Sequence, residues 1–228
     1  MTRITIIVHI LDLLSNKMKT KRAININLIS VVIITIALLI SATVFASTED
    51  AKTKVQVVFS QVEAALIKLK QTEALTKTNI RDVLSKYLLP ELDARYFTYK
   101  VLNKNMPKVP DELKEAFITE LSLQLINTYS NLLNKYNNEV IHVGQSTLSK
   151  SGKMAMVDVT IVGKTKTNKA VVKLLQSNEQ AWLFFDIEVE GISLLQTKQA
   201  EINASFNKLG VEGTLLHLQK INQKVVDG

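Results

Sequence analysis

The sequence predicts an α+β domain: N-terminal helices, then a four-stranded antiparallel meander sheet and C-terminal helices, enclosing an apolar cavity. Two observations lead to this fold class. Apolar residues recur at helical spacing from about residue 50 to residue 136, and the period changes to two after Asn137 and Asn138. Helices that precede a hairpin-connected sheet are expected to lie against one of its faces.

Residues 1–46 are predicted to be a leader rather than part of the fold. Within it, residues 17–46 resemble a secretory signal peptide, because a basic segment precedes the apolar run Leu28–Phe45. Val44 and Ala46 supply the small residues expected at a cleavage site, so we expect cleavage near Ala46. Such a leader would direct the protein to export.

Two alternatives for this leader stay open. The apolar run has 18 residues, which is the lower limit for a membrane-spanning helix, so an uncleaved anchor is the alternative to a signal peptide. Met1 and Met18 are both candidate start sites. In either case, residues 47–228 are predicted to form a single domain.

The charge of the chain gives little reason to expect a nucleic-acid partner. The formal net charge is +7, but five basic residues and one acidic residue lie before residue 47. Residues 47–228 therefore hold 23 basic and 20 acidic residues, a net charge of +3, with no interleaved basic and aromatic patch. The chain has no cysteine, which excludes disulfides and thiol chemistry.

Four helices are predicted before the sheet. The first carries one apolar stripe, the second ends before a proline, and the fourth is long and begins with a proline followed by two acids. The residues that define these helices are 50–70 for the first, a Thr78 or Asn79 cap and Pro90 for the second, Asp93 as the start of the third, and Pro110-Asp111-Glu112 as the start of the fourth.

Four segments with period-two alternation are predicted to be strands, and the short polar breaks between them are typical of hairpins. These segments are Glu139–Leu148, Lys153–Gly163, Lys169–Gln176 and Gln180–Glu190. In the last of them, Asp186 and Glu188 are interpreted as acids that keep one strand face in water.

The C-terminal part returns to helical spacing after a tight break at Gly191. Ser193, with Gln196 three residues later, has the form of a capping box. Gly210 stands where a helix end favours a positive φ, and a last helix is predicted over Thr214–Lys224.

Catalytic and metal-binding motifs are not found in the sequence. It contains no nucleophile elbow, no phosphate-binding loop and no dinucleotide fingerprint. Outside the leader, His142 and His217 stand alone without a metal-ligand spacing, and Asp186 with Glu188 is interpreted as a solvated pair rather than a catalytic one. The sequence therefore predicts neither an enzyme nor a metal site.

A series of spaced motifs resembles the C-terminal signature of the MlaC family of periplasmic phospholipid carriers. The residues that carry it are Trp182, Asp186, Gly191, Ile192, Ser193, Leu194, Leu195, Lys198, Gln199, Phe206, Leu209, Gly210, Val211, Gly213, Leu215 and Leu218. A second patch is similar to the family's L-x-P…V-L-G segment. It consists of Leu88-Leu89-Pro90 and Val101-Leu102, with Asn103 in place of the glycine.

The resemblance implies a carrier that moves phospholipid and keeps the outer membrane asymmetric. Its implied partners are phospholipid, an inner-membrane ABC transporter complex with an MCE-domain subunit, and an outer-membrane lipoprotein–porin complex. The phospholipid is cargo, and no cofactor is implied. The alternative from a different class is a cell-envelope chaperone or adaptor whose apolar groove holds a peptide.

The predicted site for the lipid tails lies between the long helix and the sheet. On three strands, apolar residues occupy both faces, which is more apolar surface than a half-solvated sheet needs. A sheet covered by helices on both faces is the alternative explanation, and which face would turn inward is left open. The residues predicted to line the cavity are Phe117, Leu121 and Leu125 from the helix, Val157, Val159, Ile161, Val172 and Leu174 from the sheet, and Phe206 from the C-terminal helix.

Overall fold

The computed structural model describes residues 48–226, and the predicted leader with its cleavage site lies outside them. The helices before the sheet are α3 (Thr48–Gln71), α4 (Lys77–Tyr87), η1 (Leu89–Glu91), α5 (Ala94–Leu102), η2 (Asn103–Lys108) and α6 (Asp111–Leu133). None of the helices in this described part has the length and hydropathy needed to span a bilayer.

The sheet is an antiparallel meander in the order β1-β2-β3-β4-β5. Its strands are β1 (Val140–Leu148), β2 (Met154–Val162), β3 (Thr167–Gln176), β4 (Trp182–Val189) and the short β5 (Ile192–Ser193). The predicted α+β architecture is thus confirmed, with β5 as a short fifth strand that the alternation did not indicate.

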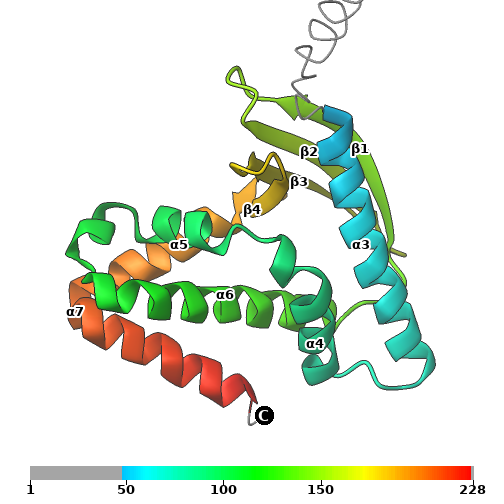
Figure 1. Ribbon diagram of the computed structural model, residues 1–228. Helices are drawn as coiled ribbons and strands as arrows, with labels where there is room; N and C mark the ends of the chain where they lie inside the picture. Colours follow the sequence, from blue (N-terminus) through cyan, green and yellow to red (C-terminus); the bar gives the residue numbers. More distant parts are fainter. Residues whose placement is uncertain (1–47, 227–228) are drawn as a thin grey trace, which may run out of the picture. The chain divides into compact units, whose positions relative to one another are not determined.

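The two faces of the sheet differ in burial. Val157, Val159, Val172 and Leu174 are buried on one face, which we call the inner face, and helix α3 crosses it (Figure 1). On the opposite face, Met154 is 39% exposed and Met156 is 42% exposed. The structure therefore answers the question of which sheet face turns inward.

Helix α6 is surrounded by other helices: it packs against α4, α5 and α7 (Leu194–Val226) beside the sheet (Figure 1). At the face toward α7, the rings of Phe117 and Phe206 have centroids 5.8 Å apart. On the sheet side, the ring of Phe59 from α3 stacks on Phe184 of β4, with centroids 6.3 Å apart. These contacts belong to one continuous apolar core that joins the helices to the inner face.

The C-terminal helix changes direction at Gly210, as its sequence predicts. Gly210 has φ 70° and ψ −169°, a conformation open mainly to glycine, and it divides α7 into two helical halves. Asn222 fixes the second half to α6, because its side-chain oxygen accepts hydrogen bonds from Gln124 and Asn127, each at 2.9 Å. The last helix is therefore held partly by polar contacts in a buried position.

One helix cap differs from the sequence prediction, and one backbone angle accounts for a position in the family pattern. Helix α4 begins at Lys77, and Thr76 is its cap, since the Thr76 hydroxyl accepts a hydrogen bond from the backbone nitrogen of Asn79 at 3.2 Å. The predicted caps Thr78 and Asn79 already lie in the first turn. At Asn103, φ is 44° and ψ is −119°, a positive-φ backbone conformation that glycine adopts most easily, and this agrees with the glycine in the family pattern.

Candidate functional site

A small apolar cavity lies where β4 meets α5 and α6. Its volume is about 20 Å³, room for about one water molecule. Pockets that hold small molecules usually measure about 300–1,000 Å³. Its lining residues are Leu88, Leu92, Phe97, Leu125, Tyr129, Phe184, Phe185, Asp186, Ile187 and Leu194.

Eight of the nine residues predicted to line a lipid cavity are buried, and Ile161 is half-buried against them. The structure brings Phe117 and Phe206 into ring contact, and it places the predicted sheet residues on the inner face. Leu125 is the one member of the predicted set that also borders the small cavity. A tail site between these residues stays a prediction.

The other nine residues around the small cavity were not part of the prediction. Leu92 and Phe184 lie together at this cavity because a backbone bridge pairs them. Next to the bridge, the Asp93 nitrogen donates to the Phe184 carbonyl at 2.8 Å. This bridge joins the segment after Pro90 to the free edge of β4. The Leu-Leu-Pro motif was visible in the sequence, but its spatial partner was not.

Asp186 is buried, which corrects its interpretation as a solvated acid. The pairing of β3 with β4 shifts between Lys173 and Leu174, so that Phe185 is an extra residue in β4. The bulge buries both Phe185 and Asp186, and the Asp186 side chain is only 4% exposed. The ring of Phe185 packs edge-on against Tyr96 of α5, with centroids 5.2 Å apart.

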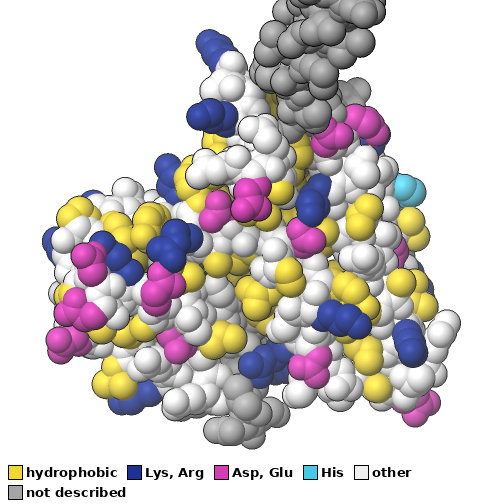
Figure 2. Space-filling view, viewed as in Figure 1, with side chains coloured by type: hydrophobic (Ala, Val, Ile, Leu, Met, Phe, Trp, Pro, Cys, Tyr) yellow, Lys and Arg dark blue, Asp and Glu magenta, His cyan; other side chains and the backbone are white. Residues whose placement is uncertain are grey.

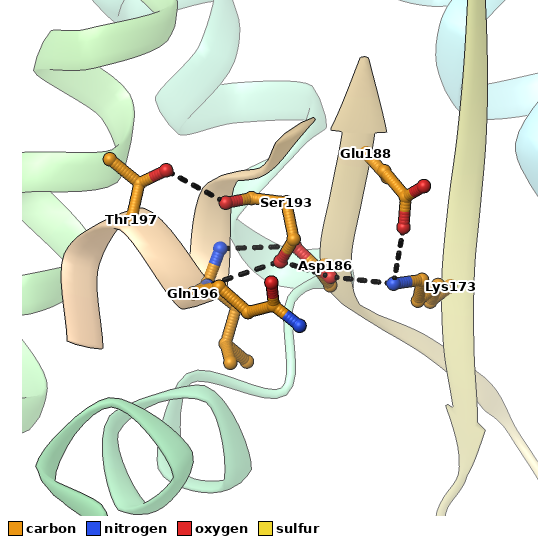
Figure 3. Close-up of polar contacts among 7 residues, drawn as sticks. Lys173, Asp186, Glu188, Ser193, Gln196 and Thr197 are labelled. Atoms are coloured by element: carbon orange, nitrogen blue, oxygen red, sulfur yellow. Dashed lines mark hydrogen bonds and ion pairs between the residues drawn. The ribbon is translucent and has the colours of Figure 1, made fainter. Parts of the chain in front are cut away.

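The Asp186 carboxylate ties the sheet to the start of α7 (Figure 3). One oxygen accepts from the Leu195 backbone nitrogen at 3.0 Å, and the other accepts from the Ser193 hydroxyl at 2.8 Å. The Ser193 hydroxyl in turn accepts from the Gln196 backbone nitrogen at 3.1 Å, as the predicted cap requires. The positive end of the helix dipole lies at this point, and it favours a carboxylate.

Lys173 completes this network from β3. Its ammonium group lies 3.1 Å from Asp186 and 2.9 Å from Glu188. Partial burial lowers the pKa of Lys173, but the hydrogen bonds to Glu188 and Asp186 outweigh that effect and raise the pKa above its ordinary value. Because the Asp186 carboxylate is already engaged by three donors, its geometry suits a structural role and not acid–base catalysis.

Tyr129 of α6 lines the cavity beside Asp186. Burial raises the pKa of the Tyr129 phenol, and the negative charge of Asp186 raises it further. The phenol is therefore neutral at physiological pH. Within residues 48–226 no cluster of His, Cys, Asp or Glu could hold a metal ion.

Removing the Asp186 carboxylate is expected to weaken the fold. In Asp186→Ala, the start of α7 loses two hydrogen bonds to a charged acceptor, and Lys173 loses one of its two ion-pair partners. The free energy of unfolding should therefore fall by about 2–4 kcal/mol. Glu188→Ala is the control, because the Glu188 side chain is more exposed and its carboxylate pairs with Lys173 but does not hold the start of α7, so it should change stability by less than about 1 kcal/mol. Urea denaturation of both variants measures the difference, and equal losses would contradict this role for Asp186.

Comparisons with known proteins give a family and a fold. The family model described as MlaC protein matches residues 57–220. A solved structure of the phospholipid-binding protein from Ralstonia solanacearum, in complex with a phospholipid, has a TM-score of 0.69. It is 17% identical in sequence, and the match covers 78% of this chain and 99% of that chain. At this identity, the structural match shows a shared fold.

Proposed function

Because this chain belongs to the MlaC family of periplasmic, phospholipid-binding and non-enzymatic lipid carriers, we propose that it is itself a periplasmic carrier of phospholipid. The observation that carries the proposal is the family match, which extends over residues 57–220. The shared fold with a protein whose structure contains a phospholipid supports it.

The physical need for such a carrier follows from the cost of exposing lipid tails. A diacyl phospholipid has on the order of 30 methylene groups, and each exposed one costs about 0.8 kcal/mol in water. Free transfer is therefore disfavoured by more than about 20 kcal/mol. A carrier has to supply apolar surface for the tails and leave the headgroup in solvent, and it needs no catalytic residue.

We place the tails between α6 and the inner face of the sheet, at the nine residues predicted from the sequence. Their burial in one continuous apolar core supports this placement, since tails entering there would exchange protein contacts for lipid contacts. The cavity of about 20 Å³ is far too small for tails, so loading requires the helices and the sheet to separate. We expect this separation to begin at Leu125, because Leu125 borders the small cavity and also belongs to the predicted tail site.

Family membership also suggests the route. The carrier would exchange phospholipid with an outer-membrane lipoprotein–porin complex and with an inner-membrane ABC transporter complex that has an MCE-domain subunit. This exchange would help to keep the outer membrane asymmetric.

Organic extraction of the purified, processed protein tests the proposal. Mass spectrometry of the extract should find phospholipid in amounts comparable to the protein. A protein that carries no phospholipid but captures unfolded polypeptides would instead be the envelope chaperone, and the carrier proposal would be wrong.

Export makes a separate prediction about the N-terminus. If residues 17–46 are a cleaved signal peptide, the protein released by osmotic shock should begin near Ser47. N-terminal sequencing checks this. Membrane-bound protein that begins at Met1 or Met18 would show an uncleaved anchor.

A further inference from the structure

Strand β1 forms one edge of the sheet, and no other described element pairs with its outer side. Proteins usually protect such edges with short strands, lysines, prolines or bulges. Strand β1 has nine residues without lysine or proline, and its one irregularity comes between Val143 and Ser146. Along Val140–Val143, the outward backbone groups make no hydrogen bond to any other described backbone group.

Helix α3 lies beside this edge and leaves two grooves against it. One groove of about 450 Å³ is lined by Gln56, Val57, Phe59, Ser60, Glu63, Ile141, His142 and Val143. The other, of about 390 Å³, is lined by Glu63, Ile67, Lys70, Gln71, Tyr136, Asn138, Glu139 and Val140. Glu63 borders both, so the grooves follow one another along the edge.

The grooves lie where an added strand would direct half of its side chains. Ile141 and Val143 pair with Ile161 and Val159, so they belong to the inner face, the side on which α3 lies. A strand placed next to β1 would point alternate residues the same way, about 6–7 Å apart. The grooves present exposed apolar surface to such residues, since Val57 is 47% exposed and Ile67 is 37% exposed. On the face shown in Figure 2, hydrophobic side chains reach the surface over α3.

The charges of the grooves favour a basic occupant. Among the described residues, the Glu63 carboxylate has no hydrogen-bond or ion-pair partner. The basic groove residue Lys70 is already engaged, since it donates to the Asn137 side chain at 2.9 Å and lies over the Tyr136 ring. Two copies of this chain joined edge to edge would bring two Glu63 carboxylates to one interface without a free basic partner.

We propose that the Val140–Val143 edge and the two α3 grooves bind an extended segment of a partner protein, which adds to the sheet as a strand. The segment has apolar residues at alternate positions and a lysine or arginine that pairs with Glu63. Backbone hydrogen bonds to β1 supply affinity, and the grooves and Glu63 select the sequence. This binding surface goes beyond the proposed lipid transport, because it lies outside the residues proposed to hold the tails.

Selection from a phage-displayed library of random twelve-residue linear peptides tests the proposal with the processed protein as bait. Selected peptides should alternate apolar and polar residues and include a lysine or arginine. Their affinity should fall at least tenfold for Glu63→Lys. It should stay within twofold for the control Gln61→Lys, which changes an exposed residue of α3 that lines neither groove.

Hydrogen exchange of the protein with a selected peptide locates the contact. Slower exchange confined to Val140–Val143 and the facing side of α3 would support strand addition, and a peptide methylated at alternate backbone nitrogens should not bind. The proposal would be overturned if Glu63→Lys and Gln61→Lys changed the peptide affinity equally, or if hydrogen exchange slowed at other parts of the protein. It would also be overturned if the selection enriched no peptide. A dimer of the free protein that Glu63→Lys dissociates would also overturn it, because the occupant would then be a second copy.

Lipid content separates this test from that of the proposed function. Glu63→Lys should retain as much phospholipid as the unaltered protein. Peptides that bind a protein without phospholipid would leave the edge proposal standing while the carrier proposal fails.

Discussion

Leu121→Glu and Val159→Glu are each expected to lower the bound phospholipid at least tenfold while leaving the protein folded. Leu121 is 0% exposed and Val159 is 2% exposed, one on α6 and one on the inner face of the sheet. An unpaired carboxylate among hydrocarbon tails costs several kcal/mol, which is more than a tenfold loss of affinity requires. A wall that opens to admit tails also admits water, and water can solvate the new carboxylate.

Phospholipid per protein and the thermal midpoint have to be measured together for these variants. Leu121→Met and Val159→Ile are the matched controls, because the first nearly conserves volume and the second adds one methylene, and neither introduces a charge. Both should keep the lipid and the fold. A variant that no longer folds would place its residue in a permanently closed core. Full lipid content in both folded glutamate variants would show that the tails lie elsewhere.

Trp182→Ala is expected to lower the free energy of unfolding by about 3–5 kcal/mol, whether or not lipid is bound. Trp182 is 3% exposed, and the register of β4 places it on the same face as Phe184, the face that α3 covers. Its burial on this face makes Trp182 part of the continuous apolar core. Truncation to alanine removes a large buried ring and leaves a cavity at the first residue of β4.

Far-ultraviolet circular dichroism in urea is the suitable measurement, because Trp182 is the only tryptophan in the chain and its removal eliminates the tryptophan fluorescence signal. Trp182→Phe serves as the control, since it keeps an aromatic ring and should lose much less stability. An alanine variant as stable as the unaltered protein would contradict the core role. If that variant also lost phospholipid, Trp182 would belong to the wall of the lipid site.

Features that depend on neighbouring residues could be predicted from the sequence. The alternation predicted a strand over Lys153–Gly163, and the structure has β2 at Met154–Val162. Ser193 and Gly210 marked the start and the turn of α7, because caps and positive φ angles are set by local chemistry. Asp93 likewise caps α5, accepting from the Tyr96 nitrogen at 2.9 Å.

Features that depend on distant partners could not be predicted. The bulge at Phe185 arises from the pairing of β3 with β4, and it changed Asp186 from an apparent surface acid to a buried anchor of α7. Periodicity places Val157 and Val172 on one face, but it does not say that α3 crosses that face while α6 packs among helices. For the same reason, the sequence could show which candidate lipid residues share a face of a helix or strand. It could not show which of them contact one another.

Native mass spectrometry of the intact, processed protein tests the carrier proposal most directly. The protein, purified without detergent, should have the mass of the polypeptide plus a diacyl phospholipid, and collisional activation should release that lipid. The phospholipid-binding protein from Ralstonia solanacearum, measured in the same way, is the positive control. A polypeptide mass alone, before and after incubation with phospholipid vesicles, while the control retains its lipid, would contradict the proposal that this chain carries phospholipid.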